Sequence, residues 1–315
     1  MAGASCPGHA QSRLQRLLFF SPFWPKLRLR CQTRPRGKCS ASHRKEKSAR
    51  MSKPHHPPVC FPITLTRINH LGRYEVDDLL LREEAYNLIC NGKTVACLHC
   101  MPDKLEELAV GRLFTLGLLQ DARQIRSLGI LPPASSRPQA ATDAKGTAVK
   151  TRTAQSPDQR PAGSMTVTLD APPPAVSVPE DDIRLTADRV HELQAEFEER
   201  CNLYRLTGAA HSCALADPSG VLLFYEDIAR HNALDKLIGA MLLRGISPQG
   251  KLMIFSGRLA LDMLEKSAAC GVRLLVAPGA PSLAAVELAR TVNISILGFV
   301  RQGNINIYTC PHRII

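Results

Sequence analysis

The sequence predicts an α/β protein in which strands alternate with helices over residues 181–315, preceded by a smaller α+β block. Three observations support this prediction. Short apolar runs, typical of buried strands, alternate there with segments whose apolar residues recur at helical spacing. The composition, 44% apolar and 22% charged, is that of a globular protein. A chain of 315 residues is also long enough for one or two domains with a large core.

Residues 1–60 are predicted to be a basic head without a core of its own. Residues 1–50 contain eight Arg and four Lys against one acid, Glu46, so nearly all of the formal charge of +12 lies there. The rest of the chain is almost neutral, which does not favour nucleic acid as a partner. An Arg-rich, acid-poor head is typical of an organellar transit peptide. The alternative is translation from Met51, or a disordered arm.

The eleven cysteines are odd in number and scattered without a repeating spacing. This pattern does not indicate a secreted disulfide framework, and a reducing compartment is expected. No apolar run approaches the roughly 18 residues that a membrane span needs, so no membrane partner is expected. The predicted location is the cytoplasm, or the mitochondrion if the head is a transit peptide.

Residues 61–131 are predicted to form the α+β block. Residues 86–90 and 94–99 have the composition of strands, and Asn91-Gly92 between them is a strong hairpin signal. A helix is expected to begin at Pro102. Its buried face would carry Leu105, Leu108, Ala109 and Leu116.

Residues 132–180 change in composition and include nine prolines. They are predicted to be a mobile insertion or linker, with one short strand candidate at residues 165–169.

Residues 181–315 are predicted to contain repeated βα units. A helix should follow Thr186, a candidate cap. Further helices are indicated by apolar residues at helical spacing over 234–242, 261–268 and 281–291. The predicted strands cover residues 221–225, 252–255, 272–277, 294–300 and 305–309. Such units predict a largely parallel sheet with helices on its faces.

Three of these strands end in residues suited to a phosphorylated ligand. In parallel sheets ligands bind beyond the carboxyl ends of strands, against helix N-termini. Glycine lets backbone N–H groups approach a phosphate, and arginine binds its oxygens in a bidentate manner. The candidates are Arg230 and His231 after the first strand, Ser256, Gly257 and Arg258 after the second, and residues 278–282 after the third. Each of these segments taken alone is also compatible with an ordinary strand-to-helix turn.

The sequence contains one CxxC pair, Cys97 and Cys100. On a strand, their side chains would point to opposite faces about 10 Å apart along the chain, so a shared metal is not expected. His211 and Cys213 resemble half of a zinc deaminase signature, but its glutamate and its cysteine pair are missing. The sequence therefore predicts no metal site.

Residues 226–236, EDIARHNALDK, resemble the EDxGRHNALDK signature of the FdhD/NarQ family of formate dehydrogenase accessory sulfurtransferases. The similarity extends from about Phe61 to Ile315 and leaves residues 132–180 unmatched. Ala209, Ala229 and Gly279 replace residues that are usual in the family. Further family landmarks appear in order at residues 207–211, 256–258, 265–266, 270–272, 280–282, 298–301, 308 and 311–314.

The resemblance implies a cytoplasmic protein with a cytidine-deaminase-like α/β domain, often a homodimer. It implies a sulfur carrier that takes persulfide sulfur from a cysteine desulfurase. That sulfur would pass to the molybdenum of bis(molybdopterin guanine dinucleotide) for formate dehydrogenase or another molybdoenzyme. By the same resemblance, this client cofactor should be held at Phe299, Val300, Arg301, Gln302, Gly303 and Asn304. The alternative for that segment is a plain hairpin turn.

One family feature is missing from the sequence. Family members usually carry a CxxC on a mobile loop ahead of residues 207–211, and its first cysteine carries the persulfide. Here no cysteine lies between Met101 and Arg200. Since a persulfide carrier needs an accessible thiolate, two hypotheses follow. The first is a sulfurtransferase that uses a relocated thiol, Cys97, Cys100 or Cys213, less efficiently than a loop CxxC. The second is a non-catalytic cofactor-binding chaperone.

Overall fold

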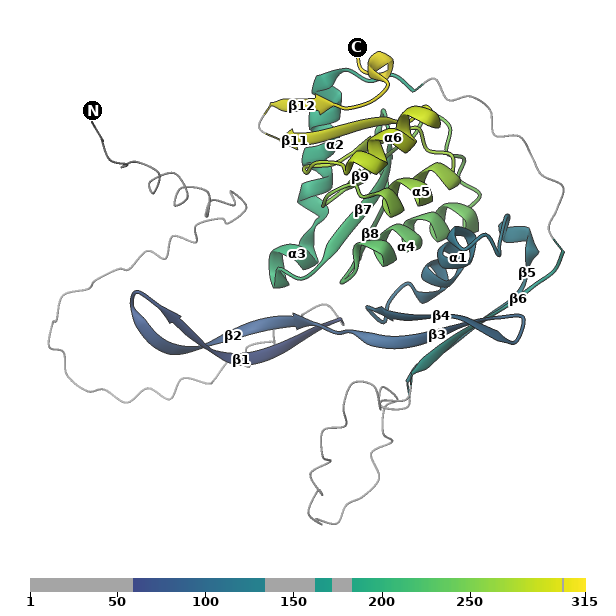
Figure 1. Cartoon of the computed structure of the whole chain (residues 1–315). Coiled ribbons are helices and arrows are strands. Elements are labelled where there is room, and N and C mark those ends of the chain that lie inside the picture. Colours follow the sequence, from purple (N-terminus) through teal and green to yellow (C-terminus); the bar gives the residue numbers. More distant parts are fainter. Residues whose placement is uncertain (1–58, 134–161, 172–182, 302) are drawn as a thin grey trace, which may run out of the picture. The chain divides into compact units, whose positions relative to one another are not determined.

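The computed structural model describes residues 59–133, 162–171, 183–301 and 303–315 (Figure 1). These residues belong to one compact unit. Nearly all of the predicted basic head, most of the predicted insertion and Gln302 lie outside the described residues.

The N-terminal part begins with two hairpins. Strands β1 (Cys60–Asn69) and β2 (Gly72–Leu81) form a two-stranded sheet that the sequence analysis did not predict. Strands β3 (Glu84–Cys90) and β4 (Lys93–Cys100) form the predicted hairpin. Asn91 and Gly92 both have positive φ, as a tight turn between two such strands requires. The prediction from Asn91-Gly92 is confirmed.

A second sheet is completed by strands from distant parts of the chain. Its order is β4-β3-β6-β5, where β5 is Ile125–Leu131 and β6 is Gly163–Leu169. The strand candidate at residues 165–169 is therefore confirmed, but its assignment to an insertion or linker is wrong. It pairs in parallel with β3 and antiparallel with β5, inside the sheet. Its apolar side chains Met165 and Val167 are fully buried there, which the surrounding Pro-rich composition does not indicate.

Helix α1 (Leu105–Thr115) covers one face of this sheet, where Leu108 and Leu113 pack against Leu88 and Met165. The helix begins three residues after Pro102, so the expected start at the proline is wrong. Lys104 precedes it with φ of 51°, a left-handed conformation that interrupts any earlier helical turn.

The C-terminal part is built on a six-stranded sheet of order β12-β11-β10-β9-β7-β8. The strands are β7 (His211–Asp217), β8 (Gly220–Asp227), β9 (Leu252–Phe255), β10 (Leu274–Val276), β11 (Ser295–Arg301) and β12 (Asn304–Ile307). Only β9, β10 and β11 are parallel neighbours. The prediction of a largely parallel sheet is corrected to a mixed one. The connections after β7 and β11 are two residues long, which permits only antiparallel pairing.

Helices cover both faces of this sheet. On one face lies α2 (Ala187–Arg200), whose first turn is capped as predicted because the Thr186 hydroxyl accepts from Arg189 N–H. A short helix, α3 (Asn202–Thr207), follows it. On the other face lie α4 (Arg230–Leu243), α5 (Leu261–Ala269) and α6 (Leu283–Thr291). The predicted α/β fold is confirmed as an α/β/α arrangement.

Helices α1 and α4 cross at two glycines and join the two parts of the chain. A Cβ placed on Gly239 would lie 1.9 Å from the Glu107 carbonyl oxygen, and one placed on Gly111 would lie 1.8 Å from the Asp235 carbonyl oxygen. The two backbones are therefore in direct contact, and no larger residue fits at this crossing.

Candidate functional site

One edge of the six-stranded sheet gathers the predicted strand-end residues. Strand β7 is antiparallel to both β8 and β9, so β8 runs in the same direction as β9, β10 and β11. The carboxyl ends of these four strands therefore meet at one edge, together with the start of β7. Arg230 and Arg258 follow the ends of β8 and β9, and Arg301 is the last residue of β11.

Polar groups on or next to three strands are hydrogen-bonded to one another at this edge. The Ser256 Oγ accepts from Ser212 N–H at 2.9 Å, and the Ser212 hydroxyl donates to Glu226 Oε1 at 3.2 Å. Leu203 N–H also donates to Glu226. Burial nevertheless raises the pKa of Glu226, because these donors offset only part of its lost hydration. Ser256 thus links the end of β9 to β7 by accepting this bond, and its predicted role in holding a ligand stays a prediction.

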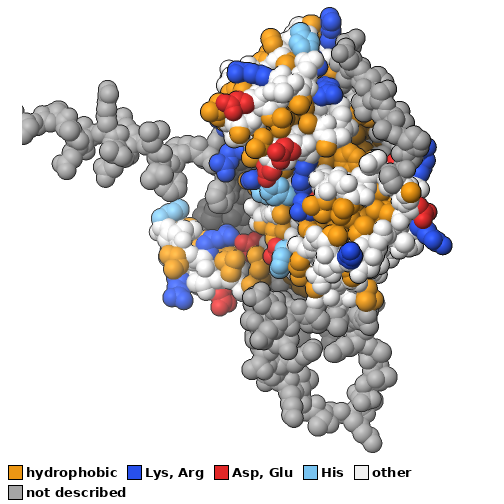
Figure 2. Space-filling model, turned by 45° about the vertical axis from the view of Figure 1, so that its right-hand side comes forward, with side chains coloured by type: hydrophobic (Ala, Val, Ile, Leu, Met, Phe, Trp, Pro, Cys, Tyr) orange, Lys and Arg blue, Asp and Glu red, His pale blue; other side chains and the backbone are white. Residues whose placement is uncertain are grey.

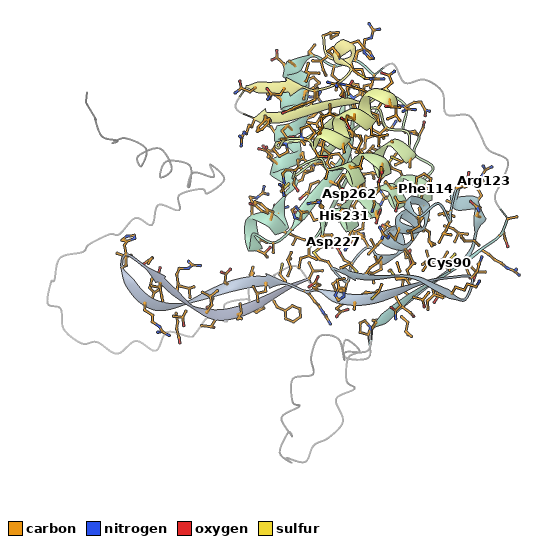
Figure 3. All side chains as sticks on the ribbon, viewed as in Figure 1. Cys90, Phe114, Arg123, Asp227, His231 and Asp262 are labelled. Carbon is orange, nitrogen blue, oxygen red and sulfur yellow. The ribbon has the colours of Figure 1, made fainter. Side chains whose placement is uncertain are left out.

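The start of helix α4 is the part of this edge best suited to an anion. Ala229 precedes the helix, and no side chain of the described ranges caps its first N–H groups. The buried Nε of Arg230 has no hydrogen-bond partner among the residues that the structure describes. The His231 Nε2 lies 3.2 Å from Asp262 Oδ2, and the two side chains are adjacent in Figure 3. Free helix N–H groups and an unpartnered arginine N–H are suitable donors for a phosphate oxygen.

His211 lies next to this helix start. A Cβ on Gly257 would be 3.9 Å from the His211 Nδ1, so the β9 loop and the β7 start are in contact. Figure 2 shows histidine side chains near acidic and basic ones on the face that it presents. In the sequence, His211 belongs to half of a zinc deaminase signature. Its position beside Gly257 and Arg230 became visible only once β7 was placed in the sheet.

The pKa of His211 provides a testable prediction. Burial lowers this pKa below its ordinary value of 6.5, and Arg230 lowers it further. The unfolded chain therefore binds a proton at higher pH than the folded chain does. Stability should be intact above about pH 6.5 and should fall as the pH drops through the depressed pKa of the folded state. In urea titrations at about pH 8 and about pH 5.5, His211→Gln should lose less stability on acidification than the unmodified chain. Equal losses of stability in His211→Gln and in the unmodified chain would contradict a lowered pKa of His211.

Arg258 and the third loop are packed together. A Cβ on Gly279 would lie 3.1 Å from Arg258 Cγ, and one on Gly298 would lie 3.0 Å from the Gly279 carbonyl oxygen. From its sequence context, Gly279 is expected to let backbone N–H groups approach a phosphate. The structure gives another reason, since Gly279 leaves room for the arginine.

The expected cofactor segment at the end of β11 is irregular. Phe299 has φ of 52° at a bulge between Gly298 and Arg301, and Val300 is buried. The Arg301 guanidinium carbon lies 5.5 Å from the centre of the Phe299 ring and the side chain is exposed. Gly303, with φ of 78°, turns the chain into β12, which begins at Asn304. Left-handed backbone at a residue other than glycine is frequent at binding sites.

The arginines are widely spaced along the edge. Strands β8 and β11 are four places apart in the sheet. At about 4.8 Å per strand, Arg230 and Arg301 start roughly 19 Å apart, with Arg258 between them. A single phosphate cannot contact all three, so one ligand shared by them must be long and carry several anionic groups.

The candidate thiols differ in accessibility. Cys97 on β4 is exposed, whereas Cys100 and Cys213 are buried. This confirms that Cys97 and Cys100 point to opposite faces of the strand. Burial raises the pKa of Cys100 and of Cys213, which keeps both thiols protonated. Of the three candidates, only Cys97 can meet a partner protein.

The described ranges contain no cluster of three or more His, Cys, Asp or Glu side chains that could hold a metal ion. None of the described helices is long and apolar enough to cross a membrane.

The model of the FdhD/NarQ family matches residues 81–315, which include the four-stranded and six-stranded sheets and all the strand ends described above. The chain belongs to the FdhD/NarQ family. It is 34% identical over 245 residues to the "Sulfur carrier protein FdhD" of Shouchella clausii, a match covering 76% of this chain and 91% of the relative. It is 31% identical over 271 residues to the protein of the same name from Bacillus subtilis, covering 79% and 98%.

A solved structure shows the same fold. It comes from Desulfotalea psychrophila and is provisionally named a formate dehydrogenase accessory protein. The TM-score is 0.65 at 25% identity, over 82% of this chain and all of the other. The cytidine-deaminase-like description of the C-terminal domain stays a prediction, as do the predicted domain boundaries.

The FdhD/NarQ motif EDIARHNALDK has a structural role that the sequence analysis missed. Asp227 Oδ1 accepts from Asn232 Nδ2 at 3.0 Å, and Asp227 Oδ2 lies 2.8 Å from Lys236 Nζ. Asn232 also donates to the His99 carbonyl oxygen, and Met101 N–H donates to Asp227. The motif therefore ties the start of α4 to the end of β4. Arg230 and His231 are left to face the edge.

Proposed function

We propose that this chain is a sulfur carrier for formate dehydrogenase that holds a nucleotide-containing molybdenum cofactor along the strand-end edge. The spacing of Arg230, Arg258 and Arg301 over roughly 19 Å carries the proposal. Bis(molybdopterin guanine dinucleotide) is long and has two separated pyrophosphates, which suits three arginines and the uncapped start of α4. The names of the relatives support the sulfur-carrier role.

The sulfur step would use Cys97. Its thiolate would attack the terminal sulfur of a cysteine desulfurase persulfide, and the desulfurase thiolate would leave as the S–S bond breaks. The sulfur then remains as a persulfide on Cys97 without net oxidation. The exposure of Cys97 on β4 supports this assignment.

The second candidate function is that of a chaperone, which binds and protects the cofactor without carrying sulfur. It is favoured by the burial of Cys100 and Cys213 and by the fixed position of Cys97 in a sheet. Because the persulfide loop is missing from the sequence, such a chaperone would have kept the cofactor-binding residues and lost the sulfur-carrying ones.

Mass spectrometry after incubation with a cysteine desulfurase and cysteine separates the two functions. A carrier should show an adduct of about 32 Da at Cys97, and Cys97→Ser should abolish it. Because Cys97 lies on a strand and not on a mobile loop, we expect this adduct to be substoichiometric. Absence of an adduct on every cysteine would exclude the carrier and favour the chaperone.

The cofactor site is tested by Arg301→Ala. The variant should lose a charge-assisted contact worth about 1.5–3 kcal/mol, or about 10- to 150-fold in affinity for GDP as a cofactor fragment. Stability should hardly change, because the side chain is exposed. Calorimetric titration measures the affinity. Arg126→Ala is the matched control, because Arg126 is an exposed arginine on β5 in the four-stranded sheet. An Arg301→Ala variant that is folded and binds GDP as well as the control would show that this segment is only a turn.

A further inference from the structure

Strand β4 forms one edge of the four-stranded sheet, because it pairs with β3 alone among the described strands. Only the end of this edge is covered by other described residues. There the His99 carbonyl oxygen accepts from Asn232 Nδ2 at 2.7 Å, and the Met101 N–H donates to Asp227 Oδ2 at 3.2 Å. The start of α4 therefore closes the edge of the sheet from His99 onward.

Cys97 is the next residue back along β4 whose backbone groups point out of the sheet edge. In an antiparallel pair, residues whose N–H and C=O face the partner strand alternate with residues whose groups face away. The bonds at His99 and Met101 show that these residues face away from β3. Cys97 continues the series, since it pairs with Asn87 in the same unbroken register. No described residue bonds to the N–H or C=O of Cys97, and its thiol is exposed.

We propose that the persulfide-bearing segment of a cysteine desulfurase adds to this edge as an extended antiparallel strand, with its persulfide residue directly opposite Cys97. The proposal rests on the proposed sulfur step and specifies how the partner is bound. Addition of a strand to an open sheet edge is a recurring way of binding an extended peptide. Because Cys97 is held in a sheet, the segment that moves to bring the two sulfur atoms together has to belong to the partner.

The spacing across such a pair fits a persulfide better than a disulfide. Cys97 would exchange two hydrogen bonds with the residue opposite, and residues paired in this way have Cβ atoms about 5.5 Å apart. A disulfide requires Cβ atoms about 3.8 Å apart, so two cysteines at these positions are too distant to form one without strain. The outer sulfur of a persulfide reaches about 2 Å further. The Cys97 thiolate can therefore attack this outer sulfur, and the thiolate of the desulfurase leaves as the S–S bond breaks.

A second copy of this chain fits the edge less well than a short peptide segment does. With a two-fold axis at Cys97, the start of α4, which covers β4 from His99 onward, would lie against the open stretch of the other copy. The open stretch is also short, because the pairing of β4 with β3 is irregular between Thr94 and Ala96. An extended segment of a few residues needs no more than this stretch.

Methylthio transfer from short peptides to the full chain tests the proposal without a desulfurase. The probe is a β-forming peptide whose central cysteine carries a methyl disulfide. The Cys97 thiolate attacks the methyl-bearing sulfur, becomes a methyl disulfide itself and releases the peptide thiolate. The control peptide has the same sequence with an N-methyl group on its cysteine, which removes the N–H that would donate to the Cys97 carbonyl oxygen. Mass spectrometry measures the rate at Cys97. The first peptide should react about 10-fold faster or more.

The double variant Cys97→Ser with Thr166→Cys is the matched control for the sheet edge. Thr166 is exposed on the same face of the sheet, but its strand β6 is paired on both sides. A thiol at this position should react at the same rate with both peptides, because no strand can be added beside it.

Equal rates of the two peptides at Cys97, or the same preference at Thr166→Cys, would overturn the proposal. A rate at Cys97 that falls as the chain is concentrated would also overturn it, because a second copy would then occupy the edge. Failure of the proposed function is a separate result. The peptide preference can be present in a chain that takes no sulfur from a desulfurase, and a persulfide can form at Cys97 without the preference.

Discussion

Gly239→Ala is expected to cause one of the largest losses of stability of any small substitution in this chain. The added methyl group would meet backbone atoms, with the Glu107 carbonyl oxygen 1.9 Å away and Gly111 N 2.8 Å away. These atoms belong to α1, so the two helices must separate. Such overpacking lowers the free energy of unfolding by about 3 kcal/mol or more. The better helix propensity of alanine raises it by about 1 kcal/mol. The free energy of unfolding should fall by about 2 kcal/mol or more.

Urea denaturation measures this change. Gly129→Ala on β5 is the matched control, because no atom of the described residues lies within 4 Å of its Cβ position and its backbone is not left-handed. Gly111→Ala should resemble Gly239→Ala. The double variant should lose less stability than the sum of the two single losses, because helices that are already forced apart can accommodate a second methyl group. Equal urea midpoints for Gly239→Ala and Gly129→Ala would contradict the direct contact of the backbones.

Lys236→Met should produce a loss of similar size for an electrostatic reason. The Lys236 side chain is fully buried, with Nζ 2.7 Å from Asp103 Oδ1 and 2.8 Å from Asp227 Oδ2. Burial alone would lower its pKa, but the two carboxylates outweigh this effect and raise it, so the lysine is charged. Removing it leaves the buried Asp227 without a cation, so the free energy of unfolding should fall by about 3–5 kcal/mol.

A second substitution separates this effect from lost packing. Lys236→Met combined with Asp227→Asn removes both buried charges, and it should recover part of the lost stability. Arg123→Met removes one charge from an exposed ion pair and should not shift the urea midpoint measurably. A double variant less stable than Lys236→Met alone would show that Asp227 acts through its hydrogen bonds to Met101, Ala229 and Asn232, not through the ion pair.

Local patterns in the sequence predicted a large part of the fold. The turn at Asn91-Gly92 and the cap at Thr186 were both predicted correctly, since each depends on the conformational preferences of a few adjacent residues. The same holds for the βα alternation over the C-terminal part. The location of the candidate site also followed, because strand ends of one direction lie at one edge whatever the order of the strands.

Other elements could not be predicted because their stability depends on distant partners. Strand β7 has the sequence HSCALAD, with few residues of high strand propensity, and it forms because both its edges are paired, with β8 and β9. Strand β6 belongs to a sheet only because β3 and β5 lie on either side of it. No local pattern identifies such partners.

The sequence by itself determined the family, the helix and strand alternation, and the set of charged residues at the strand ends. Only the tertiary structure decided what those residues do. It showed Asp227 and Lys236 as a buried pair that joins α4 to β4, and left Arg230, Arg258 and Arg301 facing the edge. It also showed Gly111 and Gly239 as a helix contact, although both look like weak positions in a helix pattern. The physical reason is that propensity and periodicity are local, whereas burial, ion pairing and close backbone contact depend on which distant segments meet.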